Sequence, residues 1–321
     1  DRETTIVDAD SSGRPFTFDG DEQHTIALSG FTFTNGIGGG IYIIDSEINL
    51  FDLNVTENIG RGIYIKNSVG DLSHVDILDN LTPNGPVASG GGIYASNSHL
   101  ILDYVNVINN YVPTSGGGAK FGSDQFGTST TEWSNSVIRG NSCLSSGGAI
   151  ASGDSVILSN LTITQNSILW NNDDGQAISG SGNLTITNSI IRENMGSTNN
   201  DNEIEFGTGT LNMSYTNLSG ADSSINLGGQ GALNWGEGNV DIDPLFVDAD
   251  NDNYHLLATS QLINAGHPDS TDADGTIADM GAYPYLNSYS GPIWYITESG
   301  NDTTATGASD DPFRSIQSGI N

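Results

Sequence analysis

Residues 105–110 read Val-Asn-Val-Ile-Asn-Asn, and residues 75–80 read Val-Asp-Ile-Leu-Asp-Asn. Each motif alternates apolar and polar residues, ends in asparagine, and returns in variant form along most of the chain. The terminal asparagines are Asn35, Asn58, Asn80, Asn110, Asn141, Asn166 and Asn194, at steps of 23, 22, 30, 31, 25 and 28 residues. Repeats of this length are typical of solenoids, propellers and related arrays.

A second short apolar segment, preceded by glycine, follows most of these asparagines, as in Gly62-Ile63-Tyr64-Ile65 and Gly90-Gly91-Gly92-Ile93-Tyr94. The apolar residues recur with period 2, which predicts strands and not helices. The repeats are too short for propeller blades, which need about 40 residues. We therefore predict an all-β fold, a right-handed parallel β-helix of about 8–10 coils with a loop-rich C-terminal cap.

Two residue types recur at fixed places in the repeat and should stack from coil to coil. The asparagines either form left-handed turns, which Asn tolerates, or hydrogen-bond into a ladder of side-chain amides. Tyr42, Tyr64 and Tyr94 also share one repeat position, which predicts a line of rings along the rod. That line is either a structural stack or a stripe that binds sugars.

The composition excludes several classes of partner. The 321 residues include 8 Lys plus Arg and 39 Asp plus Glu, for a formal net charge of −31. Nucleic acid and anionic membranes both require a basic face, so neither is expected as a partner. No apolar stretch approaches 18 residues, which argues against membrane insertion. The single Cys143 forms no intrachain disulfide and is predicted to be a small buried filler.

Residues 239–283 contain Asp243-Pro244-Leu245-Phe246, Tyr254-His255-Leu256 and Asp279-Met280-Gly281-Ala282-Tyr283. This order resembles the closing segment of bacterial secreted or surface right-handed parallel β-helix repeat proteins of the pectate-lyase-like superfold. The resemblance implies coils over residues 1–238 and a closing cap over residues 239–290. The superfold alone does not imply lyase activity.

Residues 291–321 contain Ile293-Trp294-Tyr295-Ile296 and Pro312-Phe313-Arg314-Ser315-Ile316-Gln317. They resemble the opening segment that precedes the first coil in that family, although here they follow the closing segment. Two interpretations remain open. The chain is either an excerpt of a tandem array or a subunit whose residues 291–321 dock on the open N-terminal coil of the next copy, head to tail.

Lyases of this superfold need a base and a cation that neutralises the substrate carboxylate. The sequence shows no cluster among the eight basic residues, which are Arg2, Arg14, Arg61, Lys66, Lys120, Arg139, Arg192 and Arg314. The NTD, GHG and RIK motifs of polygalacturonases are also absent. We therefore expect no catalytic residues. Arg139 and Arg192 are predicted to be outward charges on one side of the rod, two coils apart.

Two acidic turns are candidate calcium sites. Asp248, Asp250 and Asp252 alternate along one turn, and Asp272 and Asp274 lie in another. Neither turn is an EF-hand, but oxygen-rich loops favour calcium over zinc. The alternative is that both are solvated turns without metal. Calcium is the only cofactor expected.

The function expected from these features is a non-catalytic structural or adhesive module at the cell surface or outside the cell. It would assemble head to tail, or in tandem, into a fibre or surface array. The alternative is a β-helix protein that binds or degrades polysaccharide. Surface polysaccharide is therefore the second expected partner, after further copies of the chain.

Overall fold

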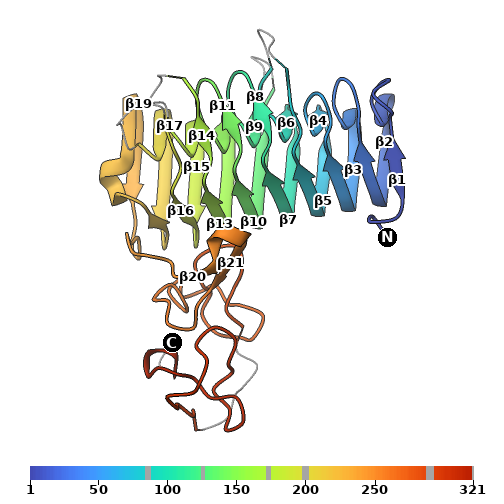
Figure 1. Ribbon diagram of the computed structural model, residues 1–321. Coiled ribbons are helices and arrows are strands. Elements are labelled where there is room, and N and C mark those ends of the chain that lie inside the picture. The colour runs from blue at the N-terminus through green and yellow to red at the C-terminus, as the bar shows by residue number, and fades with distance from the viewer. Residues whose placement is uncertain (84–87, 124–126, 171–174, 197–201, 287–292, 320–321) are drawn as a thin grey trace.

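The computed structural model describes residues 1–321 except 84–87, 124–126, 171–174, 197–201, 287–292 and 320–321. The side chains of residues 21–24 are also left out. The protein is a parallel β-solenoid of about eight turns, which confirms the predicted stack of coils. Strands follow one another along the stack from β1 to β19, and most of the described residues after β19 lie beside it (Figure 1).

Each complete coil has three faces, which we number in chain order. The first face contains β4 (Ile63–Lys66), β6 (Ile93–Ser96), β9 (Ala119–Gly122) and β12 (Ile150–Ser152). The second and third faces are the two halves of β5 (Val69–Leu78), β7 (His99–Ile108), β10 (Thr130–Arg139) and β13 (Ser155–Thr164). The third face continues with β16 (Ile190–Arg192) and β18 (Asn217–Leu218).

Several strands bend around the corners and serve more than one face. β2 (Phe16–Thr34) and β3 (Ile41–Thr56) span all three faces. β15 (Ile178–Thr187), β17 (Ile204–Ser214) and β19 (Ile225–Trp235) span the first two, and β1 (Ile6–Asp8) pairs with the end of β2. After the third face, β8 (Tyr111–Val112), β11 (Ser142–Cys143) and β14 (Ser167–Ile168) form a small sheet, in which Val112, Cys143 and Ile168 are buried together.

Left-handed residues make the corners. Between the second and third faces, Asp52, His74, Tyr104 and Asn135 have φ values of 52°, 53°, 53° and 52°. One residue in this conformation reverses the inside–outside alternation of a strand, so both flanking faces can point apolar side chains inward. A left-handed residue at each corner therefore allows a sequence of period 2 to form a closed coil with an apolar interior.

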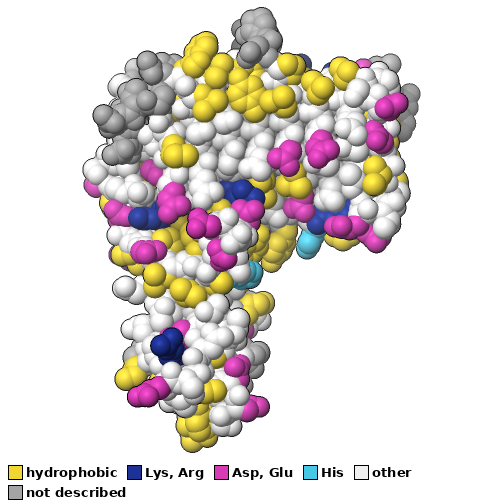
Figure 2. Space-filling view, in the orientation of Figure 1, with side chains coloured by type: hydrophobic (Ala, Val, Ile, Leu, Met, Phe, Trp, Pro, Cys, Tyr) yellow, Lys and Arg dark blue, Asp and Glu magenta, His cyan; other side chains and the backbone are white. Residues whose placement is uncertain are grey.

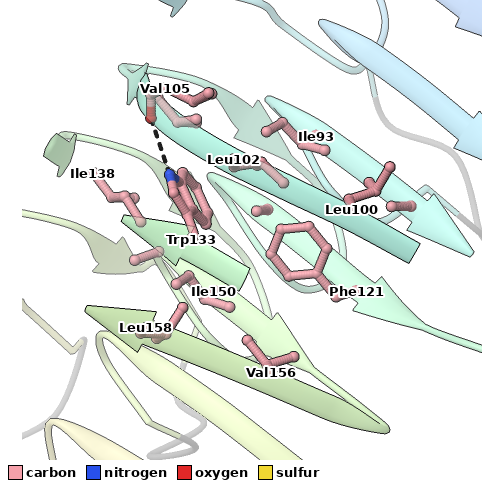
Figure 3. Packing of buried hydrophobic residues seen from close by; sticks show 14 of the residues in the cluster. Ile93, Leu100, Leu102, Val105, Phe121, Trp133, Ile138, Ile150, Val156 and Leu158 are labelled. Carbon is pink, nitrogen blue, oxygen red and sulfur yellow. Dashed lines mark hydrogen bonds between the residues drawn. The ribbon is translucent and has the colours of Figure 1, made fainter. Parts of the chain in front are cut away.

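The core consists of apolar side chains stacked in register. One column runs from Leu50 through Leu72, Leu102 and Trp133 to Leu158, and all five are almost fully buried. Figure 3 shows part of it, with the Trp133 indole N–H donating to the carbonyl of Val105 at 3.2 Å. The indole N–H thus keeps a hydrogen-bond partner although the ring is buried among apolar side chains.

The asparagines form a ladder inside the coil. The side-chain amide of each one donates to the side-chain oxygen of the next, at distances of 2.9, 2.9, 3.0, 3.0 and 2.9 Å. The ladder members are Asn58, Asn80, Asn110, Asn141, Asn166 and Asn194. From Asn58 to Asn166, the backbone N–H donates to the same oxygen as the side chain does. The ladder interpretation is confirmed, and the left-handed turn belongs to the residue before each asparagine, such as Asp79.

The two ends of the ladder differ from the sequence interpretation. Asn35 is not its first member, because Phe33 pairs with Val55 and this places Gly36 opposite Asn58. The Gly36 N–H donates to Asn58, whereas Asn35 occupies the left-handed corner and donates to Asp8. At the other end, Asn194 donates to the buried carboxylate of Glu203 at 2.9 Å.

The closing segment, residues 239–286, is loop-rich as predicted. Its first residues extend the third face, since Val240 pairs with Asn217 of β18, and the rest lies beside that face (Figure 1). It holds β20 (Phe246–Asp248), η2 (Ala249–Asn251) and β21 (Asn253–Leu256), while η1 (Ala221–Ser224) precedes β19. The Gly281 N–H donates to the Asn188 carbonyl at 2.8 Å, and the Ala282 N–H donates to Thr162 Oγ1 at 3.1 Å. The side chains of β19, the last strand of the stack, are therefore all exposed or half-exposed.

The tail, residues 293–319, packs on the closing segment and ends in η3 (Gln317–Gly319). Phe313 and Ala305 are buried against Ala258 and Tyr285. The Tyr285 hydroxyl donates to the Ala305 carbonyl at 3.1 Å. Across the described part of the chain, no helix has the length and apolar character needed to cross a membrane.

We predict that Asn110→Ala lowers the free energy of unfolding by about 3 to 5 kcal/mol, because several buried donors and acceptors lose their partner. The backbone and side-chain N–H groups of Asn80 lose their shared acceptor, and the Asn141 oxygen loses one of its two donors. Urea unfolding measures the change. Asn49→Ala is the matched control on an exposed site of β3 and should cost less than about 0.5 kcal/mol. Equal losses for the two variants would contradict a stabilising ladder.

Candidate functional site

The predicted line of tyrosines exists on the outside of the first face. Tyr42 pairs in register with Tyr64, and Tyr64 with Tyr94. Their ring centroids lie 4.7 Å and 5.1 Å apart, and both pairs are stacked at an interplanar angle of 8°. Residue register alone therefore brings three aromatic rings together at one side of the rod.

The stacking limits what this line can bind. A sugar packs best on a free aromatic face, but here the rings face one another at van der Waals distance. Burial raises the pKa of the Tyr64 hydroxyl above its usual value, so the hydroxyl stays neutral near pH 7. The stack therefore presents ring edges and hydroxyl groups to a ligand.

Two arginines lie against the tyrosine stack. Phe16 pairs with Ile41 and Ile41 with Ile63, so Arg14 and Arg61 hold the same repeat position two coils apart. The Arg14 guanidinium lies 4.4 Å from the centroid of the Tyr42 ring, and that of Arg61 lies 4.6 Å from the centroid of Tyr94. Both are cation–π contacts.

Sequence interpretation missed this pair because the two arginines are 47 residues apart. A signal was present, since each stands two residues before the first strand of its coil, in Arg14-Pro15-Phe16 and Arg61-Gly62-Ile63. On the same face, Lys120 continues the line of tyrosines, because it pairs in register with Tyr94. The first face thus collects positive charge on a chain of formal net charge −31.

The backbone fixes both guanidinium groups. Arg14 Nε donates to the Gly38 carbonyl at 2.6 Å, and Arg61 Nε donates to the Ser89 carbonyl at 2.7 Å. Burial is the main cause that lowers the pKa of Arg61, and it also lowers the pKa of Lys120. The arginines, Tyr42 and Tyr64 line a surface cavity of about 360 Å³. We call it the Tyr–Arg cavity.

Arg139 and Arg192 lie on one side of the rod, two coils apart, as predicted, because both are in register with Thr164. They also contact the closing segment. Arg139 forms an ion pair with Asp252, and Arg192 forms one with Asp241. The hydrogen bond from Arg192 lowers the pKa of Asp241. These arginines therefore fasten the closing segment to the coils.

The first candidate calcium turn uses its carboxylates in local contacts. Asp248 accepts a hydrogen bond from Asn251 at 2.8 Å, Asp252 pairs with Arg139, and Asp250 is exposed. The turn includes η2, and it places Asp252 in the left-handed conformation.

The second turn is organised around Asp279, whose N–H donates to Asp272 at 2.9 Å. Burial raises the pKa of Asp279 to about 7, although its carboxylate accepts from the N–H groups of Asn264 and Tyr285. Asp274 accepts from Thr276 at 2.7 Å. Within the ranges that the structure describes, no three His, Cys, Asp or Glu side chains come together as metal ligands. Calcium binding stays a prediction for both turns.

No family model matches this sequence, and no curated protein matches it. The residues themselves and their geometry therefore carry the functional inference.

We predict a coupling of about 0.5 to 1 kcal/mol between Arg139 and Asp252, because one partner is largely buried and the other is exposed. A double-mutant cycle of Arg139→Met and Asp252→Asn, followed by urea unfolding, measures it. Asp250→Asn in the same turn is the matched control and should show no coupling to Arg139→Met. Equal coupling for the two aspartates would mean that the ion pair does not fasten the segment.

Proposed function

We propose that this chain is a non-catalytic structural or adhesive β-helix module that assembles head to tail, outside the cell, into a fibre or surface array. The observation that carries the proposal is the apolar surface of the tail. Ile293, Trp294, Tyr295, Ile296 and Ile316 are 58%, 38%, 40%, 40% and 69% exposed. Figure 2 shows apolar side chains on the surface of the lower part of the molecule, where the tail lies. Exposed apolar side chains that gather on one segment indicate a contact surface for another protein.

The proposed docking surface is the first coil of the next copy. There, Phe16, Phe18 and Phe31 are only partly buried against the core. The resemblance of residues 291–321 to an opening segment supports this pairing, because such a segment lies before a first coil. A contact between two different surfaces of one chain repeats without closing, and therefore builds filaments.

Right-handed winding and membership of the bacterial pectate-lyase-like superfold are part of this proposal. Parallel crossover connections are right-handed in nearly all proteins, which supports the first point. The acidic composition supports an extracellular location, because charge of one sign keeps a long rod soluble. The stacked tyrosine rings favour the structural proposal over polysaccharide binding or degradation, since their faces cover one another.

We predict that Ile316→Asp weakens self-association at least about tenfold, because burying a carboxylate in place of an isoleucine removes apolar contact and adds a desolvation cost. Sedimentation velocity over a concentration series measures the association. Electron microscopy of the same samples checks for filaments.

The matched control is Ile157→Asp on the second face, where Ile157 is 43% exposed. It should leave association unchanged. A wild-type chain that stays monomeric at high concentration would refute the proposal, as would equal weakening by the two substitutions.

A further inference from the structure

The Tyr–Arg cavity carries positive charge without a matching carboxylate. Arg2, Arg139 and Arg192 each form an ion pair with aspartate. Among the described residues, by contrast, neither Arg14 nor Arg61 has a carboxylate within 4 Å. In so acidic a chain, two arginines that line the same cavity without acidic partners require an explanation.

Glycine keeps the space between the two arginines open. The coil between them has Gly39 at the position that Arg14 and Arg61 hold in their own coils. Gly39 has a φ of +111°, and a Cβ there would come 2.6 Å from the Arg61 carbonyl oxygen. No larger side chain fits that position, so the middle coil adds no side chain to the cavity at this place in the repeat.

The arginines are also held ready for a ligand. Each uses its Nε–H on a backbone carbonyl, which leaves the four N–H bonds of the terminal nitrogens for other partners. The Tyr42 ring contacts the Arg14 guanidinium, and the Tyr64 ring contacts the Arg61 guanidinium. Ile37 and Ile59 also line the cavity. Such fixed donors lose little entropy on binding.

We propose that Arg14 and Arg61 together bind a tetrahedral oxyanion, the sulfate or phosphate group of a ligand. Two guanidinium groups supply two positive charges and paired N–H donors, which match a dianion with several oxygens. A carboxylate carries one charge and two oxygens, so it neutralises only one of the two guanidinium groups. The proposal goes beyond assembly through the tail, and either one can fail without the other.

Isothermal titration of the full chain with sodium sulfate and with sodium phosphate, at constant ionic strength, tests the proposal. We expect saturable binding at one site for at least one of them, and acetate should bind at least about tenfold more weakly. Tighter binding of sulfate indicates a sulfated ligand, and tighter binding of phosphate indicates a phosphorylated one. No saturable binding, or equal binding of acetate, overturns the proposal.

Variants localise the site. Arg61→Gln should weaken binding of the tighter anion at least about tenfold, and Arg61→Lys, which keeps the charge but loses the planar fork, should also weaken it. Arg314→Gln removes the same charge from the tail and should leave binding unchanged. Thermal unfolding checks that the variants are folded, and if Arg61→Gln is not, Arg61→Lys decides. Unchanged binding in a folded Arg61 variant overturns the proposal.

Discussion

The structure depends on one buried interaction, the hydrogen bond from one asparagine amide to the next. An amide inside the coil costs several kcal/mol unless its donors and acceptors are satisfied. The ladder satisfies them only when neighbouring coils keep the same register. The loops therefore absorb every difference in repeat length. Gly62 follows Asn58 by four positions, whereas Gly92 follows Asn80 by twelve positions in the next coil. The irregular spacing in the sequence thus coexists with a regular interior.

Constant register also builds the outer surface. Once the coils align, residues at one repeat position become neighbours, however far apart they are in the sequence. The tyrosine stack and the pair formed by Arg14 and Arg61 arise in this way. A solenoid can therefore assemble a site from residues that have only their position in the repeat in common. The coil interior fixes the spacing between them.

The structural features that could be predicted from the sequence are those that depend on the periodicity of the repeat. The coils follow from the repeat itself, and the line of tyrosines follows from one repeated position. The asparagine ladder was one of two alternatives for another repeated position. Asn35 was misassigned because the motif around it looks like the others but is shifted by one residue, and only the pairing of Phe33 with Val55 shows the shift. The Arg14–Arg61 pair was missed because glycine interrupts it in the middle coil. The contacts of the closing segment, such as Arg139 with Asp252, could not be predicted because that segment has no repeat and folds against the coils.

Native-state hydrogen exchange, followed by NMR, tests the central claim most directly. The backbone amides of Asn58, Asn80, Asn110, Asn141 and Asn166 all donate to the next side chain. If the ladder holds the coils together, these amides should exchange only when the whole stack unfolds, and therefore with one common free energy of opening. Exchange as fast as that of exposed loop amides would show that the ladder opens locally, and would contradict the account.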